Sequence, residues 1–233
     1  MRVLWLFLAL VGLLAAACGS DGDDSASEGG VDGLAGRAPP VVTGTATATA
    51  QAAASDLSDR LDAMTLDEDD VPRGLSPLRS TTFDYDASLL GVVGSEASKA
   101  HMTMFAGPGQ QEMVMSVVIL LDDAWAVEQA LAQMENLTVD QIQDTFGMPG
   151  NFDGPKLRDS RPLDVSDLGE TAFGFALTFE LPQLGTGDGQ WVFFGRDSVL
   201  AMTMTMGMDG IVPVDAVLMA ELMDDKIKDE LLQ

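Results

Sequence analysis

The sequence predicts an α+β domain in which helices cover an antiparallel sheet of about five or more strands, preceded by a signal peptide and a disordered linker. Three observations lead to this prediction. Apolar residues alternate in several stretches between residues 99 and 208, which is typical of strands. Turn-forming glycines separate these stretches. Apolar residues recur at helical spacing in residues 124–137 and 214–232, which predicts amphipathic helices beside the sheet.

Residues 1–17 have the pattern of a signal peptide. Arg2 precedes an uninterrupted apolar run, Val3–Ala17, which has the length of a signal-peptide core and is short for a membrane span. The run ends in Leu-Ala-Ala-Ala followed by Cys18, which resembles the bacterial lipobox, where the cysteine is acylated and becomes the first mature residue. Cys18 is therefore the predicted lipidation site, which would anchor the protein on the extracytoplasmic face of the cell membrane. Ala15 and Ala17 also fit an ordinary cleavage site, which would release a freely secreted protein.

Residues 18–55 form a predicted linker, and residues 56–233 form the predicted globular domain. Residues 19–36 consist mainly of Gly, Ser and Asp without Lys or Arg, and residues 38–54 are uncharged and rich in Thr, Ala and Pro. Neither stretch can bury a core, so the linker should be disordered. About 36 flexible residues reach about 30–35 Å, which is enough to hold a domain clear of the lipid headgroups.

The charge and the cysteine count exclude several classes of protein. The chain has 37 acidic against 12 basic residues, a formal net charge of -25, and only five of the acids and two of the bases precede Ser55. A domain with this negative charge repels phosphate backbones, and we therefore expect no nucleic-acid partner. One Cys rules out an internal disulfide, and one Cys with one His excludes the common zinc sites. No cofactor is expected.

The first half of the domain begins with a short predicted helix at Leu57–Met64. The segment Thr65–Pro72 follows with a threonine that could cap a helix, acids suited to a first helical turn, and a terminating proline. Residues 87–98 form a further predicted helix. Two strands, Lys99–Phe105 and Gln111–Leu121, are then joined by a Gly-Pro-Gly turn, and the second strand is apolar on both faces, which places it in the middle of a covered sheet.

The second half of the domain alternates between helices and strands. Asp122 or Asp123 can cap a helix at residues 124–137, and a short helix is predicted at residues 139–146. Three antiparallel strands follow at residues 171–182, 190–195 and 198–208, with a glycine-rich turn predicted at residues 185–189. A closing helix at residues 214–232 carries an apolar stripe.

Three short motifs carry a resemblance to a known group of proteins. They are Thr-Leu-Asp-Glu-Asp-Asp-Val-Pro at residues 65–72, Leu-Gly-Glu-Thr-Ala at residues 168–172 and Phe-Phe-Gly-Arg-Asp at residues 193–197. With the lipobox and linker, this layout resembles small extracytoplasmic lipoproteins of high-GC bacteria with PsbP-like or sensor-type folds, over most of residues 60–232. The resemblance implies a binding or accessory module rather than an enzyme. Sensor-type members often carry disulfides in the domain, which this sequence cannot form.

Catalytic chemistry finds little support in the sequence. A Ser-His-acid set would require His101, the single imidazole, but no G-x-S-x-G motif accompanies it. The simpler interpretation of His101 is a half-exposed residue of a strand. A carboxylate pair could hydrolyse glycosides, but among so many acids no pair stands out. The sequence therefore predicts a protein that is not an enzyme.

Methionine is unusually frequent, with 14 residues, many of them two apart. Thioethers suit copper(I), and alternate residues of a strand lie on one face. The candidate copper ligands are His101, Met102, Met104 and Met113. The alternative is that these methionines fill the core face of the sheet.

Small residues form a second candidate surface, on the opposite side of the strands from the methionines and phenylalanines. Its members are Gly174, Ala176, Thr178, Ala201, Thr203 and Thr205. Such a surface admits either a tightly docked helix or a cleft for an apolar ligand such as a lipid tail.

Together these patterns predict a membrane-anchored extracytoplasmic lipoprotein that acts as a non-catalytic ligand- or partner-binding module of the cell envelope. Its expected partners are the membrane, through Cys18, and an envelope protein or a small apolar ligand. The alternative function is a carrier of lipid or another apolar ligand in a cavity between sheet and helices. Copper(I) handling and hydrolysis by acidic residues follow as weaker alternatives.

Overall fold

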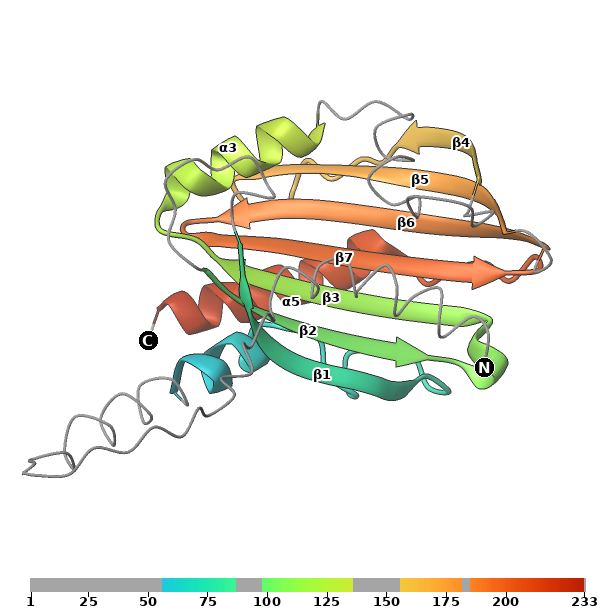
Figure 1. The fold of residues 1–233 in the computed structure, drawn as a ribbon, viewed down its shortest axis with the longest axis horizontal. Helices are drawn as coiled ribbons and strands as arrows, with labels where there is room; N and C mark the ends of the chain where they lie inside the picture. Colours follow the sequence, from blue (N-terminus) through green and yellow to red (C-terminus); the bar gives the residue numbers. More distant parts are fainter. Residues whose placement is uncertain (1–55, 87–97, 136–155, 182–184, 233) are drawn as a thin grey trace, which may run out of the picture.

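The computed structural model describes residues 56–86, 98–135, 156–181 and 185–232, and within these ranges the chain forms one antiparallel sheet with helices on both faces (Figure 1). The predicted α+β class is therefore confirmed. The signal peptide, Cys18 and the linker lie outside the described residues. So do the short helix predicted at residues 139–146 and all but the last residue of the helix predicted at residues 87–98.

The sheet has seven strands within the described ranges. They are β1 (Ser76–Tyr85), β2 (Ser98–Ala106), β3 (Glu112–Leu120), β4 (Lys156–Pro162), β5 (Thr171–Leu181), β6 (Gly185–Arg196) and β7 (Val199–Met208). Their order across the sheet is β1-β2-β3-β7-β6-β5-β4, and every neighbouring pair is antiparallel. The pairing of β3 with β7 joins the β1–β3 meander to the β4–β7 meander.

Helices lie on both faces of this sheet. Helix α3 (Ala124–Glu135) packs on β5, β6 and β7 from one side, and α5 (Ala216–Leu231) packs on β6 and β7 from the other (Figure 1). Asp123 caps α3 by accepting a hydrogen bond from Ala126 N at 2.8 Å, and Asp215 caps α5 by accepting one from Val217 N at 3.0 Å. A further helix at residues 56–63 confirms the predicted N-terminal helix and lies on the same face as α5.

The predicted central strand is confirmed. β3 pairs with β2 on one side and with β7 on the other, and its residues from Met113 to Ile119 are buried on both faces. Such double burial explains the continuous apolar run in its sequence. The core therefore consists of two apolar layers, one on each side of the sheet.

Two strands went unpredicted because they lie at the edges of the sheet. β1 has the sequence SPLRSTTFDY and its first half is exposed, and β4 has the polar sequence KLRDSRP. An edge strand that buries few side chains has no alternating apolar pattern, so its sequence resembles that of a loop.

Two local predictions were wrong. The glycine-rich segment at residues 185–189 is not a turn but the start of β6. Gly187 leaves room for the Phe179 ring of the neighbouring strand β5, since a Cβ on Gly187 would lie 2.6 Å from that ring. Residues 65–72 form turns rather than a helix. The Thr65 hydroxyl donates back to Asp62 O at 2.8 Å, and Asp67 N donates to Asp70 Oδ2 at 2.8 Å, so local polar bonds satisfy this backbone.

Candidate functional site

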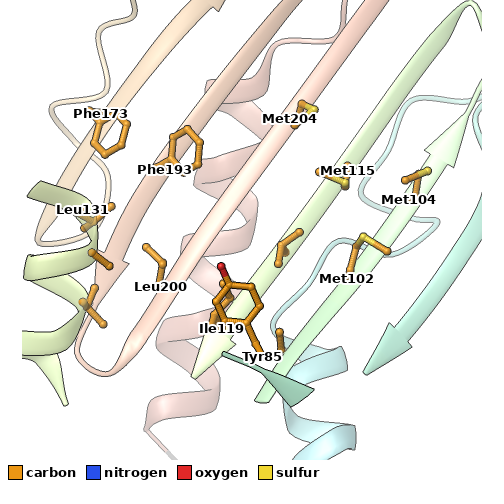
Figure 2. Packing of buried hydrophobic residues seen from close by; sticks show 14 of the residues in the cluster. Tyr85, Met102, Met104, Met115, Ile119, Leu131, Phe173, Phe193, Leu200 and Met204 are labelled. Carbon is orange, nitrogen blue, oxygen red and sulfur yellow. The ribbon is translucent and has the colours of Figure 1, made fainter. Parts of the chain in front are cut away.

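The first candidate site is the apolar face of the sheet that carries the methionines, here called the methionine face. Met104, Met115 and Met204 stand directly opposite one another on β2, β3 and β7. The same row continues through Trp191 on β6 to Phe175 on β5. Figure 2 shows Met104, Met115 and Met204 side by side on this face. The row crosses five strands, or about 19 Å at the usual strand spacing.

The methionine face extends to both sides of this row. Further members on the five strands β2, β3, β7, β6 and β5 are Met102, Met113, Met202, Met206, Met208, Phe173 and Phe193. Phe173 and Phe193 stack with their ring centroids 5.0 Å apart, and Phe175 meets Phe173 edge to face at 5.6 Å. No charged side chain occupies this face along these five described strands.

Helix α3 packs at one end of the methionine face. Its Val127 and Leu131 lie so close to β6 that a Cβ on Gly195 would come within 2.4 Å of Val127 Cγ1 and 2.9 Å of Leu131 Cδ1. Figure 2 shows Leu131 beside Leu200, whereas Met115 and Met104 lie well away from this helix. The helix therefore packs on the part of the face near the β6–β7 turn.

The opposite face, here called the α5 face, carries the six small residues that the sequence singled out as a ligand surface. Thr203 is fully buried and donates to Ala216 O of α5 at 3.0 Å, and Ala201 is buried in the same layer. Gly174 lies under Val165, whose Cγ1 would be 3.3 Å from a Cβ at that position. Of the two alternatives for this surface, a tightly docked helix and a ligand cleft, Ala201 and Thr203 therefore fit the docked helix.

The remaining members of that surface lie apart from these residues. β6 separates Gly174, Ala176 and Thr178 on β5 from the residues on β7. Thr178 donates to Asp188 Oδ1 at 2.7 Å, and Thr205 is fully buried. The structure therefore does not bring the six residues together into one open surface.

The four candidate copper ligands do not converge either. Met102 and Met104 point to the methionine face, and Met113 lies on this face of β3, while His101 points to the α5 face because neighbouring residues of a strand alternate. All three methionines are buried. The structure thus separates the imidazole from the thioethers.

The second candidate site is polar and surrounds His101, between β1, β2 and the helix at residues 56–63. Its Nε2 lies 2.9 Å from Asp62 Oδ1 and 3.0 Å from Ser80 Oγ, and its Nδ1 lies 2.8 Å from Thr82 Oγ1. The Thr82 hydroxyl also lies 2.7 Å from Ser58 Oγ. His101 is 4% exposed, so the expectation of a half-exposed histidine was wrong. Burial lowers the pKa of the imidazole, and the Asp62 carboxylate opposes this only in part.

The polar partners of His101 and the aromatic end of the methionine face were not predicted from the sequence. Ser80 and Thr82 alternate along β1 and stand beside His101 across the hairpin, so a correct prediction of β1 would have found them. Trp191 and Phe175 share a register row that depends on the exact pairing of β5 with β6. The prediction of a turn at residues 185–189, which are the first part of β6, hid this register.

A charged cluster around Lys226 holds the acidic turn to α5. Lys226 Nζ lies 2.6 Å from Asp67 Oδ2 and 2.6 Å from Asp70 Oδ2, and it donates to Thr65 O at 3.3 Å. The hydrogen bond from Lys226 holds the pKa of Asp67 below its ordinary value. This cluster ties residues 65–70 to α5, which is a structural role. Across the described ranges, no group of three or more His, Cys, Asp or Glu residues could hold a metal ion, and no helix is long and apolar enough to span a membrane.

Comparison with known proteins gives no family for this chain. No protein-family model matches it, and no curated protein matches it. The extracellular domain of PknH from Mycobacterium tuberculosis is similar in structure with a TM-score of 0.49 and 12% identity, over 75% of this chain and 96% of that chain. An uncharacterised protein from Mycobacterium smegmatis, an Rv0999 ortholog, has a TM-score of 0.42 and 8% identity, over 74% of this chain and 95% of that chain. The PsbP-like and lipoprotein resemblance stays a prediction.

Proposed function

We propose that this chain is a membrane-anchored extracytoplasmic module that binds a ligand without catalysis, and that the ligand is a lipid acyl chain held against the methionine face. The observation that carries this proposal is the row Met104, Met115, Met204, Trp191 and Phe175, which crosses five strands on a face without charge. Met104, Met115 and Met204 are themselves buried, so an acyl chain would take the place of contacts that these side chains now make. On the α5 face, α5 packs directly on the small residues.

The side chains of the row suit an acyl chain. Methionine is unbranched and adapts its shape to an irregular apolar surface, and aromatic rings add large apolar area. The row is about 19 Å long, and an acyl chain spans about half of a hydrocarbon core that is about 30 Å thick. One chain could therefore lie along the row in an extended form.

The anchoring part of the proposal rests on the sequence. The lipobox-like ending at Cys18 and the predicted linker would hold the domain within about 30–35 Å of the lipids that it would bind. Changing Cys18→Ser should abolish both the acyl mass on the mature protein and its retention in the membrane fraction. A Cys18→Ser protein that still fractionates with membranes would refute lipid anchoring and leave ligand binding to be judged separately.

The non-catalytic part of the proposal is supported by His101. This single imidazole is buried, and both of its ring nitrogens already have hydrogen-bond partners. A general base needs a nitrogen that can reach a substrate proton. His101 is held instead between three elements of the fold.

Native mass spectrometry of the mature protein, purified gently from its own membrane, tests the ligand. We expect an extra mass of lipid size that disappears on denaturation. Met115→Gln places an amide in the centre of the row and should weaken retention of this lipid about tenfold. Met223→Gln is the matched control, because Met223 is fully buried on the α5 face and its replacement removes a similar apolar contact.

The two variants separate ligand binding from stability. Both should lower the free energy of unfolding, but only Met115→Gln should release the lipid. Equal loss of lipid from both variants would mean that the effect is one of stability and not of a site on the methionine face. A native mass without any extra component in the wild-type protein would overturn the lipid proposal and favour a protein partner.

A further inference from the structure

The contacts of His101 join the first helix of the domain to the edge of the sheet. Asp62 and Ser58 belong to the helix at residues 56–63, Ser80 and Thr82 belong to β1, and His101 belongs to β2. The three elements meet at one buried imidazole. This helix directly follows residue 55, where the predicted linker ends, so these bonds stand where the linker enters the domain.

The charges that face this imidazole are few. Asp62 Oδ1 lies 2.9 Å from Nε2, and the Asp62 side chain is 60% exposed, so water screens its charge. Next to His101 on the same face of β1 and β2, the carboxylate of Asp84 is already paired with Lys99. From β3, the neighbour of His101 is the apolar Val118.

The other charged residues of the helix at residues 56–63 face α5 or the solvent. Arg60 faces Glu230 of α5 at 3.8 Å, and Asp56 and Asp59 are exposed. A protonated His101 would therefore have the hydrated Asp62 carboxylate as its counter-charge. This weak attraction would have to compensate for the hydration that the imidazolium loses by being buried.

Protonation also reverses the direction of the hydrogen bond between Nδ1 and Thr82. In the neutral ring that donates from Nε2 to Asp62, Nδ1 accepts from the Thr82 hydroxyl, and Thr82 Oγ1 accepts from Ser58. A proton on Nδ1 makes this nitrogen a donor. The Thr82 hydroxyl then accepts from the ring, and its own hydrogen loses Nδ1 as an acceptor.

We propose that His101 is a pH-sensitive latch, whose protonation loosens the docking of the helix at residues 56–63 on β1 and β2. Acidification then frees the segment that connects the domain to its linker, while the sheet and α5 stay folded. This inference is independent of what the methionine face binds. It concerns how the domain is held to the segment that precedes it.

The pH window follows from the two states of the ring. With the helix undocked, His101 is open to water and has an ordinary pKa of about 6.5, whereas burial lowers its pKa in the docked state. The undocked state therefore binds more protons between these two values. Docking is strongest above about pH 6.5 and weakens by up to about tenfold per pH unit below it, until the docked ring also titrates.

Hydrogen exchange on the full mature protein, read by mass spectrometry and corrected for intrinsic rates, tests the latch. Between about pH 7 and pH 5, protection at residues 56–63 should fall about a few-fold, and protection in β3, β7 and α5 should stay constant. In His101→Gln, which keeps a donor and an acceptor but no titrating group, this local pH dependence should disappear. Equal changes throughout the domain, or an unchanged response in His101→Gln, would overturn the proposal.

A second measurement does not depend on the folding of that variant. His101 is the only histidine of the chain, so one imidazole resonance in the NMR spectrum reports its pKa directly. We expect a midpoint below about 6.5 in the wild-type protein and a lower midpoint in Asp62→Asn, which removes the facing carboxylate. A midpoint at or above the ordinary value would overturn the latch, because protonation would then favour docking.

Discussion

Arg196 donates two hydrogen bonds to the buried carboxylate of Asp224, from Nε to Oδ1 at 2.5 Å and from Nη2 to Oδ2 at 2.9 Å. Arg196 is the last residue of β6 and Asp224 lies within α5, so the pair joins the sheet to the C-terminal helix. Lys228 Nζ lies 2.9 Å from Oδ2 of the same carboxylate. Burial by itself would raise the pKa of Asp224, but the hydrogen bonds from Arg196 and Lys228 outweigh burial and hold this pKa below its ordinary value.

We expect Arg196→Ala to lower the free energy of unfolding by about 3 kcal/mol at neutral pH, because the Asp224 carboxylate then stays buried without its two-point partner. Urea unfolding followed by circular dichroism measures this loss. The exposed pair of Arg158 and Glu180 provides the control, and Arg158→Ala should cost less than about 1 kcal/mol. Similar losses in both variants would show that the buried pair has no special role.

The same pair predicts a dependence on acid. A carboxylate with a lowered pKa in the folded state contributes stability above the unfolded pKa of about 3.9, and this stability is lost as the pH falls through the folded pKa. The unfolded state binds protons alike in the wild-type protein and in Arg196→Ala, so the difference in stability between them depends on the folded pKa of Asp224 in each. This difference should be constant near neutral pH and should shrink as the pH falls through these two pKa values, first the one in Arg196→Ala, where the carboxylate has lost the hydrogen bonds from Arg196. Urea midpoints across this range provide the measurement, and a difference that grows in acid would contradict the assignment.

The contact between α3 and the sheet can be tested at Gly195. Gly195→Ala brings a methyl group within 2.4 Å of Val127 Cγ1 and should cost about 2 kcal/mol, because α3 must shift or Val127 must leave its rotamer. Gly107→Ala is the control, since its Cβ would meet only ordinary contacts from 3.4 Å outward. That variant should be neutral or slightly stabilising. Thermal unfolding measures the stability of both variants. A Gly195→Ala protein as stable as the wild type would mean that α3 is loosely packed.

Two threonines on the α5 face should respond in opposite directions to the same change. Thr203 donates to Ala216 O, so Thr203→Val leaves a buried carbonyl without this donor and should cost about 1 kcal/mol. The Thr205 hydroxyl is buried without a hydrogen-bond partner in the described part of the chain, so Thr205→Val should be neutral or stabilise by up to about 1 kcal/mol. Urea unfolding compares the two. Loss of a bound ligand in either variant would return this face to consideration as a binding surface.

Tyr85 predicts how the protein unfolds in alkali. Burial, with a smaller contribution from the charge of Asp86, raises its pKa to about 12. In the unfolded chain Tyr85 loses its proton near pH 10. The free energy of unfolding should therefore fall between about pH 10 and pH 12, by about 3 kcal/mol in total, because only the unfolded chain is ionised at Tyr85 in this interval.

Tyrosinate absorbance reports this titration without ambiguity, because Tyr85 is the only tyrosine. In Tyr85→Phe, the decline in stability over this interval should be smaller than in the wild-type protein. A tyrosinate midpoint near pH 10 in the folded protein would contradict the buried position of the ring.

Much of the core could be predicted from the sequence because its signals are local. The run from Met113 to Leu121 predicted a strand buried on both faces, since no exposed strand tolerates so many apolar side chains. The stripe at Ala216, Ala220, Met223 and Ile227 predicted the buried side of α5 from spacing alone. The alternation of Met202, Met204 and Met206 with Thr203 and Thr205 likewise predicted two different faces of β7.

The sites depend on pairings that no local pattern contains. His101 has an unremarkable sequence context, and its role follows from β1 and the helix at residues 56–63, which bring Thr82 and Asp62 to it. The edge strand β1 left little apolar pattern, so its partnership with β2 could not be predicted.

By itself, the sequence determined the composition of each face, the acidic surface and the expectation of an exported, anchored chain. These properties follow from short-range periodicity and residue counts. Only the tertiary structure decided which face is packed under α5, that Met104, Met115 and Met204 form one row, and that His101 stands apart from them. The physical reason is that side-chain packing between residues far apart in the chain sets the strand register and the face of the sheet on which each helix packs. The sequence of a single strand or helix does not contain this information.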